Sequence, residues 1–455
     1  MPDPASQSPD VVIVGAGIAG LVAARELAIG GVRVTVVEAS SRAGGKVASH
    51  EVCGMLLDSG AESFATRGDT VRTLALELGL AASIVTPNPV GAWLYPADGK
   101  PKPLPKTGIL GIPGTAMAGD VIAVVGLLGA FRAQLDTLLP GFIGSRERYL
   151  GPLVRKRMGR RLLDRLVAPV AAGIHSRHPD ELEVDVVAPA LRAALRDQES
   201  LAHAVRMIRA AATAGSQVAG LAGGIHQLVA AIQHELIELG VQLRFDSPVA
   251  SFDPTGITFD GGERVECSRV VLAVSPNSLG RSASESDARI ILATLVINSS
   301  ELDAAPRGTG LLVAAGAHGI QAKALTHATA KWAWLDDAAG AGRHVLRLSF
   351  DGDRIGARSD TELQEIARTD AERLLGVALP ASTVIGFARA EWFAPLPSRA
   401  EPPDGVSLIG ESAAGTGLAA VIGQAQSEAH SILSSFTGIN DGRGDDGEHD
   451  IDPEQ

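Results

Sequence analysis

Cysteine is scarce in this chain, and its scarcity argues against two kinds of protein. The 455 residues include only Cys53 and Cys267, which stand far apart and form no C-x-x-C pair. A disulfide framework or a cysteine-bound metal centre is therefore not expected. His175 and His178 are three residues apart, but a His-x-x-His pair without a further nearby ligand is more often structural. We expect no metal, and two reduced thiols in a cytoplasmic protein.

Long hydrophobic runs are also lacking. The longest, Val121 to Phe131, is bounded by Asp120 and Arg132 and is shorter than the about 20 residues that cross a bilayer. The first ten residues have neither the basic region nor the apolar core of a signal peptide. We interpret the apolar run as a buried helix. The alternative is a helix that rests on a membrane or lines an apolar channel, which would make a peripheral membrane contact.

Positive charge is in deficit, with 40 Lys and Arg against 52 Asp and Glu. The resulting net charge of -12 argues against nucleic acid as a partner and against bulk attraction to anionic membranes. An anionic substrate would need a local basic patch. One segment, residues 155–170, has helical apolar spacing and six basic residues: Arg155, Lys156, Arg157, Arg160, Arg161 and Arg165. A solvated helix face is the favoured interpretation, and an electrostatic guide for an acidic substrate or partner is the alternative.

Against these shortages stands a glycine-rich stretch near the N-terminus. An apolar run, Val11 to Val14, predicts a buried strand, and Gly15, Gly17 and Gly20 follow with G-x-G-x-x-G spacing. These glycines allow a tight turn, close approach of the backbone to a pyrophosphate, and close packing of helix on strand. The helix that begins near Ile18 would direct its positive end at the phosphates. A second strand, Val32 to Val37, ends in Glu38, which could accept hydrogen bonds from a ribose.

The chain is too long for one ordinary core, so two or three domains are expected. We expect the nucleotide domain to resume in two later stretches. The first has a helix from Ile225 to Leu239 and strands at Val241–Phe245, Val249–Phe252 and Val270–Val274. The second has a strand at Val406–Ile409, then Gly410, Gly415 and Gly417 and a helix from Leu418 to Leu433.

The remaining segments differ in character from the nucleotide domain. Between its returns we expect a mainly helical stretch to about Pro189, continuing as helix over Val184–Ala214. Strands of a second sheet are expected at Ile290–Asn298 and His344–Phe350, with a helix at Thr361–Leu375. The first ten residues and the acidic segment from Gly438 to Gln455 should be disordered.

After Glu38 the chain continues with Arg42, Gly44, Gly45 and Lys46. This E-x-x-x-R-x-G-G-K pattern resembles the signature of flavin amine oxidases and their relatives, which implies FAD rather than NAD. Further segments resemble the porphyrinogen oxidases of haem biosynthesis: DSGAESFATR at 58–67, PLPKTGILGIP at 103–113, GPLVRKRMGRRLLDRLVAPVAAGIHSRHPDEL at 151–182, LAGGIHQL at 221–228, KALTHATAKW at 323–332 and EWFAPLP at 391–397. The chain departs from that family at Ala172, at Ser398 and Arg399, and at Ala419 and Ala420, where a Pro-Asp pair is usual.

The resemblance implies an α/β fold. It would comprise a Rossmann-like FAD-binding domain of the p-hydroxybenzoate hydroxylase/amine oxidase type, an α+β substrate domain and a helical subdomain. The FAD-binding domain would take residues 1–72, 224–279 and 388–437, the substrate domain 73–112, 190–223 and 280–387, the helical subdomain 113–189, and the tail 438–455. The cofactor-binding residues would be Gly15, Ala16, Gly17, Ile18, Ala19, Gly20, Glu38, Ala39, Arg42, Gly44, Gly45, Lys46, Gly60, Ala61, Glu62, Ser63, Val249, Trp392, Gly410, Gly417, Leu418 and Ala419.

By the same resemblance, the reaction is an oxygen-dependent, six-electron oxidation of a porphyrinogen, with hydride passing to the flavin and hydrogen peroxide formed. Arg67, Gly173 and His175 are the expected substrate-side residues, and Arg67 could pair with a propionate. Coproporphyrinogen III is the favoured substrate, protoporphyrinogen IX the alternative, and a ferrochelatase a candidate recipient of the product. Other readings are an amine oxidase, for which an aromatic cage is hard to build with only Tyr95 and Tyr149, a carotenoid desaturase, or a non-catalytic porphyrin carrier.

Overall fold

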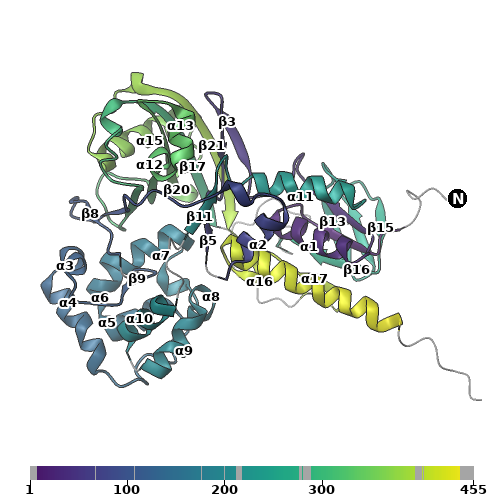
Figure 1. Ribbon diagram of the computed structural model, residues 1–455, viewed down its shortest axis with the longest axis horizontal. Coiled ribbons are helices and arrows are strands. Elements are labelled where there is room, and N and C mark those ends of the chain that lie inside the picture. Colours follow the sequence, from purple (N-terminus) through teal and green to yellow (C-terminus); the bar gives the residue numbers. More distant parts are fainter. Residues whose placement is uncertain are drawn as a thin grey trace, which may run out of the picture.

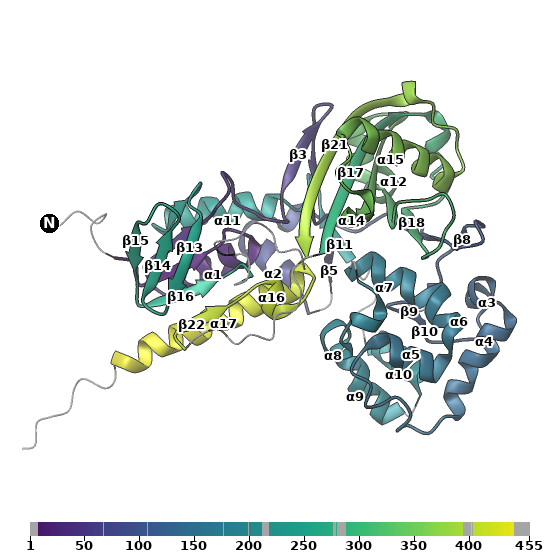
Figure 2. The same cartoon turned by 180° about the vertical axis from the view of Figure 1, so that it is seen from behind.

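A computed structural model of the chain describes residues 8–66, 68–106, 108–175, 177–198, 200–211, 218–275, 279, 288–394, 402 and 404–440. Figure 1 shows three units: a nucleotide domain at one end, a helical lobe at the other, and a sheet domain that adjoins both. Figure 2 gives the reverse view. Arg67 and the tail from residue 441 lie outside the described residues, as does the segment 1–7. The expectations for them stay predictions.

The nucleotide domain is built on a five-stranded parallel sheet in the order β12-β2-β1-β16-β22. The strands are β1 (Val11–Val14), β2 (Val34–Val37), β12 (Gln242–Arg244), β16 (Arg269–Leu272) and β22 (Val406–Leu408). The four residues of β1 are buried, as a continuous apolar run in the middle of a parallel sheet requires. The predicted strands are confirmed, and four of the five are one or two residues shorter than expected. Because three distant segments supply the strands, the chain leaves this domain and returns to it.

Three helices cover one face of this sheet. α1 (Ile18–Ile29) packs against α11 (Gln227–Glu238) and α17 (Leu418–Asn440). The other face carries a three-stranded antiparallel sheet of β13 (Val249–Asp253), β14 (Gly256–Phe259) and β15 (Arg264–Glu266). α2 (Thr70–Glu77) also contacts α17, and the β3 (Ser49–Val52)–β4 (Met55–Asp58) hairpin lies beside β21 of the sheet domain. α17 continues to Asn440, so the expectation of disorder from Gly438 is wrong for its first three residues.

The sheet domain holds seven strands in the order β21-β17-β20-β19-β18-β7-β8. They are β21 (Val384–Ala394), β17 (Ala288–Asn298), β20 (Arg343–Asp351), β19 (Ala324–His327), β18 (Gly310–Val313), β7 (Trp93–Tyr95) and β8 (Lys102–Pro103). One face packs on α15 (Asp360–Leu375), whose first turn is held by a capping box between Ser359 and Glu362. The short helices α12 (Ala328–Lys331), α13 (Ala333–Ala339) and α14 (Gly352–Ile355) pack against β20. The opposite face is turned towards the nucleotide domain and the helical lobe.

A small three-stranded sheet, in the order β5-β11-β6, connects the units. β11 (Val218–Leu221) pairs with β5 (Phe64–Ala65) and with β6 (Ile84–Val85), which joins the nucleotide segment near residue 64 to the segment that leaves it. β9 (Gly108–Ile109) and β10 (Ile112–Pro113) form a small hairpin at the entry to the helical lobe. The stretch around residues 96–113 is extended, as its alternating prolines predict.

The helical lobe has its own buried core. Its helices are α3 (Gly119–Val125), α4 (Leu127–Gln134), α5 (Leu150–Met158), α6 (Arg160–Leu162), α7 (Ala168–His175), α8 (Val184–Val187), α9 (Pro189–Gln198) and α10 (Leu201–Ala211), with a π-helical segment, η4, at Leu163–Val167. The helix expected over Val184–Ala214 is divided after Gln198 as well as at Pro189, and residues 212–217 lie outside the described part.

The apolar run Val121–Phe131 forms two helices rather than one. Gly126, with φ of +77°, separates α3 from α4, and the two axes are bent by 116°. Val121, Val124 and Val125 are buried, so the buried-helix prediction holds for α3. It is wrong for α4, which exposes large apolar side chains. Among the residues that the structure describes, no single helix is both long and apolar enough to span a membrane, although the bent pair Gly119–Val125 and Leu127–Leu138 meets both criteria together.

The basic segment at 155–170 is broken at Gly159, with φ of +90°. Arg155, Lys156 and Arg160 form surface ion pairs with Asp180, Glu147 and Asp164, as a solvated face predicts. Arg157 is different: its side chain is fully buried, paired with the equally buried Asp136, and donates to the carbonyl of Ile143 at 2.9 Å. Burial of a charge requires such pairing, so Arg157 is part of the lobe's core and not of its solvated face.

Candidate active site

The glycine-rich turn after β1 has two positions that only glycine fits and one that opens outwards. Gly15 has φ of +103°, and a Cβ there would lie 2.6 Å from Val274 Cγ1; a Cβ on Gly20 would lie 2.0 Å from the Gly15 carbonyl oxygen. A Cβ on Gly17 would meet nothing within 4 Å. The N-terminus of α1 is therefore uncovered beside Gly17, where its backbone N–H groups can receive a phosphate.

A second loop is laid against this turn. Gly17 and Gly44 form a parallel bridge, and the Gly44 N–H donates to the Ala16 carbonyl at 2.8 Å. A Cβ on Gly60 would lie 2.0 Å from the Lys46 carbonyl oxygen, and the Ala61 N–H donates to that oxygen at 2.9 Å. The backbone contacts bring the segments around residues 17, 44–46 and 60–61 side by side, as binding of one extended cofactor requires.

Glu38 stands at the end of β2 with a free side to its carboxylate. Its Oε2 accepts the Ala16 N–H at 2.8 Å, and its Oε1 accepts the Ser40 N–H at 2.9 Å. Oε1 also accepts the Ser40 hydroxyl at 2.8 Å, so Oε2 is the oxygen that can accept a further bond, from a ribose hydroxyl. Arg42 donates to the Ser49 carbonyl at 3.3 Å and so stabilises the loop. Ala39 directly follows Glu38 in the same loop. Val249 is buried behind β1 and β2, and the turn before it donates from Ser247 N–H to the Glu38 carbonyl.

The C-terminal glycine loop completes this side. Gly410 and Gly417 have φ of +87° and +110°, and a Cβ on Gly417 would meet nothing within 4 Å. Leu418 and Ala419 then begin α17, so a second uncovered helix N-terminus lies beside Gly417. Lys46 forms an ion pair with Glu411 at the start of α16 (Glu411–Ala414), which ties the two loops together.

A cluster of charges not foreseen from the sequence lies beneath residues 58–62. Glu62 pairs with Lys331 at 2.6 Å and with Arg347 at 3.2 Å, and Arg347 also donates to the Gly60 carbonyl at 2.9 Å. Burial by itself raises the pKa of Glu62, but the charges of Arg347 and Lys331 outweigh it and lower the pKa to about 2. Lys331 belongs to the KALTHATAKW segment, and Arg347 is a charged residue between two leucines in the middle of β20; these were the available signals.

The neighbouring residues hold the same backbone from other sides. The Trp392 Nε1–H donates to the Ser59 carbonyl at 2.7 Å, and Ser63 follows Glu62 at the start of β5. Asp58 accepts the N–H groups of Ile225 and His226 at 2.9 and 3.1 Å. Strands β4 and β21 and the start of α11 therefore fix the segment 58–62.

On the substrate side, the structure joins the helical lobe to the C-terminal glycine loop. His175, at the end of α7, has its Nδ1 2.7 Å from the hydroxyl of Thr416. Its Nε2 is buried and has no hydrogen-bond partner among the described residues. Burial lowers the pKa of His175, so the ring is neutral at neutral pH. A Cβ on Gly173 would lie 2.4 Å from Leu312 Cδ2 on β18, which explains why the residue there is small.

Between these contacts, the sheet domain offers a half-buried wall of small and apolar side chains. The cross-strand partners Ala390, Leu292, Ser349, Ala324 and Leu312 form one row across β21, β17, β20, β19 and β18, and directly opposed residues share a face of the sheet. Arg347 is two residues from Ser349 on β20, so it lies on the same face, and its side chain donates to the Gly60 carbonyl. The wall therefore runs from the segment beside the glycine turn to α7, and it can contact a broad, mostly apolar molecule.

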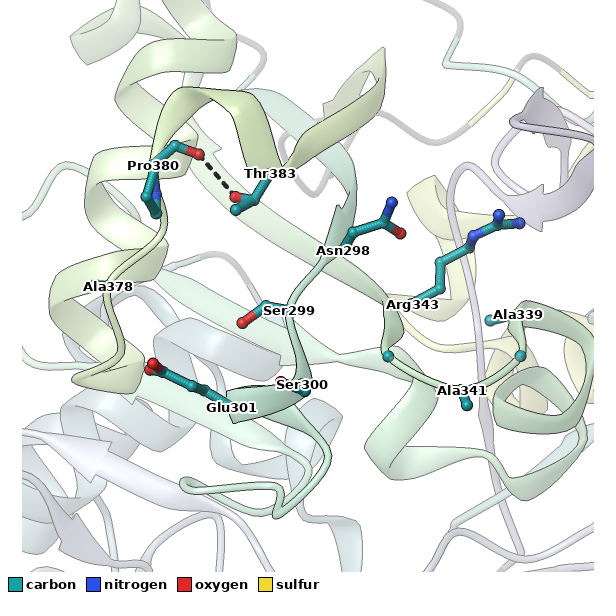
Figure 3. Close-up of a pocket in the computed structure, with 12 residues that line it drawn as sticks. Asn298, Ser299, Ser300, Glu301, Ala339, Ala341, Arg343, Ala378, Pro380 and Thr383 are labelled. Carbon is teal, nitrogen blue, oxygen red and sulfur yellow. Dashed lines mark hydrogen bonds between the residues drawn. The ribbon is translucent and has the colours of Figure 1, made fainter.

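A concavity of about 820 Å³ lies elsewhere in the sheet domain. Its lining includes Asn298, Ser299, Ser300, Glu301 and Arg343. Asn298 and Arg343 are opposite each other at the far end of β17 and β20, eight residues from the Ile290 that pairs with Trp392, roughly 26 Å along a strand. Figure 3 shows a Thr383 hydroxyl bond to the Pro380 carbonyl there, with Glu301 and Arg343 on different sides. This concavity is separate from the glycine turns.

Across the described ranges, no group of three His, Cys, Asp or Glu side chains could hold a metal ion. The site offers two uncovered helix N-termini, an acid for a ribose, and adjacent backbone segments that can contact one long cofactor.

Comparison with known proteins decides which cofactor that is. The model of the family "Flavin containing amine oxidoreductase" matches residues 18–295, more than half of the chain. The chain belongs to this family. Its cofactor is FAD, and the open space beside Gly17 and Gly417 and the carboxylate of Glu38 fit that molecule.

Within the flavin-containing amine oxidoreductases, several relatives carry the name coproporphyrinogen III oxidase. The chain is 29% identical to that of Propionibacterium freudenreichii subsp. freudenreichii over 69% of this chain and 68% of the relative. It is 28% identical to that of Mycobacterium bovis over 93% of this chain and 97% of the relative. It is also 33% identical to the chloroplastic protoporphyrinogen oxidase of Oryza sativa, over 39% of this chain. The resemblance to porphyrinogen oxidases is thereby confirmed.

Solved structures agree on the fold. A putative protoporphyrinogen oxidase of Exiguobacterium is 23% identical, covers 94% of this chain and has a TM-score of 0.77. Cyclohexylamine oxidase of Brevibacterium oxydans is 18% identical, covers 95% and has a TM-score of 0.64. The Rossmann-like α/β fold with a second sheet and a helical lobe is confirmed. The assignment of individual cofactor and substrate residues, and the domain boundaries, stay predictions.

Proposed function

We propose that this flavoenzyme oxidises coproporphyrinogen III to coproporphyrin III, with molecular oxygen as electron acceptor and hydrogen peroxide as product. The observation that carries the proposal is the match to relatives named coproporphyrinogen III oxidase along almost the whole of both chains. The second candidate is protoporphyrinogen IX, which the shorter match to the rice enzyme favours. The two substrates differ in carrying four and two carboxylates.

The arrangement of residues is suited to such a substrate. FAD supplies the two-electron acceptor, which each round of a six-electron oxidation needs. The half-buried wall that includes Leu292, Ala324 and Leu312 would contact the macrocycle and exclude water. His175, neutral and anchored on Thr416, would present its buried Nε2 as an acceptor for a proton that leaves the substrate. Arg67 keeps its proposed role as the partner of a propionate.

The test is anaerobic mixing of the purified yellow protein with coproporphyrinogen III and, separately, with protoporphyrinogen IX. We expect loss of the flavin's visible absorbance with the tetracarboxylate, and porphyrin fluorescence once air is admitted. Faster reduction by protoporphyrinogen IX would reassign the substrate. No reduction by either porphyrinogen would refute the proposed function, and putrescine would then be the next substrate to try.

Replacement of His175 tests its role within that reaction. His175→Gln keeps a polar side chain near Thr416 but removes the titratable nitrogen. We expect flavin reduction by coproporphyrinogen III to slow by about 10²-fold, the lower range for a lost general base, while the FAD content stays the same. Flavin reduction at the wild-type rate would remove His175 from the chemistry.

We also propose a cytoplasmic location, and a ferrochelatase as the protein that receives the porphyrin. The two free cysteines support the location, and the proposed product, whose next use is metal insertion, supports the recipient. Faster metal insertion when the two enzymes are mixed than when free porphyrin is supplied at equal concentration would support direct transfer, and equal rates would exclude it.

A further inference from the structure

Three charged side chains meet between the nucleotide domain and the sheet domain, and the proposed reaction gives them no role. Glu62 belongs to the segment 58–62, Lys331 ends α12, and Arg347 lies in the middle of β20. Their side chains are 13%, 15% and 15% exposed. We call these three side chains the Glu62 cluster. Charges so little exposed to solvent are weakly screened and act over longer distances than surface charges do.

The Glu62 cluster holds one more positive charge than negative. Glu62 Oε1 lies 2.6 Å from Lys331 Nζ, and Glu62 Oε2 lies 3.2 Å from Arg347 Nη2. Burial raises the pKa of Glu62, but the charges of Arg347 and Lys331 outweigh it and lower the pKa to about 2. The carboxylate is therefore ionised at neutral pH, and it balances one of the two cations.

The positive charge of the cluster acts beyond its own members. Burial first, and then the charge of Arg347, lower the pKa of His50 on β3, and Asp58 acts in the opposite sense. Asp58 directs its carboxylate to the start of α11, where it accepts the N–H groups of Ile225 and His226 at 2.9 and 3.1 Å. The carboxylate of Asp58 is thus bonded away from the Glu62 cluster.

The Glu62 cluster lies directly behind backbone that is expected to contact FAD. Arg347 donates to the carbonyls of Gly60 and Asp58 at 2.9 and 3.2 Å. A Cβ on Gly60 would lie 2.0 Å from the Lys46 carbonyl oxygen, and a Cβ on Gly45 would lie 3.3 Å from Gly17 Cα. Close contacts therefore lead from the glycine turn, through residues 45–46, to the segment that Arg347 holds.

This position favours the flavin half of FAD over the adenine half. We expect the adenosine ribose at Glu38 and the pyrophosphate beside Gly17, at the start of α1. FAD is one extended molecule, so its flavin half continues from the pyrophosphate away from Glu38. The segments 44–46 and 58–62 lie on that path, and the second uncovered helix N-terminus, beside Gly417, lies at its far end.

We propose that the Glu62 cluster sets the reduction potential of the bound FAD, with Lys331 and Arg347 raising it and Glu62 lowering it. Reduction of FAD takes up two electrons and, at neutral pH, one proton, so the flavin gains one negative charge. A nearby cation shielded from solvent stabilises that charge, and a nearby carboxylate opposes it. The proposal rests on FAD and not on which substrate the enzyme oxidises.

The test is the reduction potential of the FAD-loaded protein, measured against reference dyes of known potential during slow anaerobic reduction. Lys331→Met removes one positive charge with little change in length. We expect it to lower the equilibrium constant for flavin reduction by roughly tenfold, which is about 30 mV for a two-electron couple. Glu62→Gln removes the negative charge and should raise the constant by a similar factor.

Two further variants separate charge from packing. Glu62→Gln/Lys331→Met together leave the cluster with its original net charge, so the potential should return to that of the unaltered protein. Lys331→Arg changes the packing and keeps the charge, so it should leave the potential unchanged. Glu365→Gln is the matched control for loss of an acid, because Glu365 is 57% exposed in its pair with Arg368 on α15; its potential should also be unchanged.

The absorbance of bound flavin shows that each variant is loaded with FAD. Unchanged potentials in Lys331→Met and Glu62→Gln, or shifts of the same sign in both, would refute the proposal and leave the Glu62 cluster a structural role. If Glu62→Gln retains no FAD, the comparison of Lys331→Met with Lys331→Arg decides by itself. No porphyrinogen is used, so a negative result here is distinct from failure of the proposed function.

Discussion

Gly17 and Gly20 occupy the same turn but face different surroundings. Space is open beside Gly17, whereas a Cβ on Gly20 would lie 2.0 Å from a backbone oxygen. Gly17 has φ of -67°, which alanine adopts without strain. Gly17 is therefore needed for the ligand that binds beside it, whereas Gly20 is needed for the fold itself.

This difference predicts opposite effects of one methyl group. Gly17→Ala should leave the unfolding midpoint of the FAD-free protein unchanged and weaken FAD binding by tenfold or more, because the methyl group occupies the path of the pyrophosphate. Gly20→Ala should destabilise the apoprotein by about 1–3 kcal/mol, as overpacking does. Urea unfolding and titration of flavin fluorescence measure the two effects. Equal destabilisation by both substitutions would contradict this account.

Glu62 is an acid whose side chain is only 13% exposed and which has two cationic partners. Replacing one member of a buried ion pair leaves the others uncompensated, which typically costs about 3–5 kcal/mol. We expect Glu62→Gln to lower the free energy of unfolding by about that amount, measured by urea unfolding. Glu365→Gln is the control, since Glu365 is 57% exposed in its pair with Arg368 and should change stability by less than about 1 kcal/mol. If Glu62→Gln is as mild as the control, Glu62 does not anchor the site.

At the scale of elements, strands β19 and β20 are joined by two buried histidines, and the second of them reaches the exposed Asp303. His327 Nε2 lies 3.1 Å from His344 Nδ1, and His344 Nε2 lies 2.9 Å from Asp303 Oδ1. Burial, and then the neighbouring His344, lower the pKa of His327 to about 3. The neutral ring is thus a condition for this packing.

The lowered pKa predicts how stability depends on pH. In the unfolded chain His327 takes up a proton near 6.5, whereas the folded chain resists protonation until about pH 3. Stability is therefore lost as the pH falls through this window, by up to about 2 kcal/mol between pH 6.5 and 5. The difference between the unfolding midpoints at pH 7 and pH 5 should therefore be smaller in His327→Gln than in the unaltered protein.

His234→Gln is the control for that comparison, because His234 is 77% exposed and its replacement should leave the pH dependence unchanged. Burial also lowers the pKa values of His50 and His175, so both act in the same direction; the difference between variant and unaltered protein isolates His327. An identical loss of stability in His327→Gln would mean that the His327 ring titrates normally.

At the scale of the whole molecule, the nucleotide domain, the sheet domain and the helical lobe have separate hydrophobic clusters. The segments predicted to bind FAD come from several parts of the chain, but they are gathered at one side of the nucleotide domain. Among the described residues, contacts such as that of His175 with Thr416 join the lobe to that site. Its core residues in α5 and α10 pack on one another.

This separation predicts a local response to cofactor loss. On removal of FAD, hydrogen exchange should rise in the segments 15–20, 44–62 and 410–420 and stay unchanged in α5 and α10. Exchange mass spectrometry of the loaded and FAD-free protein measures it. A rise that reaches α5 equally would show that the lobe folds together with the cofactor site.

The sequence by itself determined the features that depend on neighbours along the chain. The turn at Gly15, Gly17 and Gly20, its strand and helix, Glu38 at the end of the next strand and the glycine pair at 44–45 all follow from local spacing. These patterns predict a nucleotide, and their resemblance to the signature of flavin amine oxidases implies that it is FAD. A backbone turn requires certain residue types at certain offsets, which is why such features are legible without a structure.

Only the tertiary structure decided which distant residues meet and which surfaces stay open. Glu62 and Lys331 are 269 residues apart, and His175 and Thr416 are 241 apart. The burial of Arg157 and the exposure of Phe131 also depend on how the helices pack, since each belongs to a segment whose periodicity fits either environment. Spacing along the chain carries no information about such contacts, because they arise only when separate elements assemble.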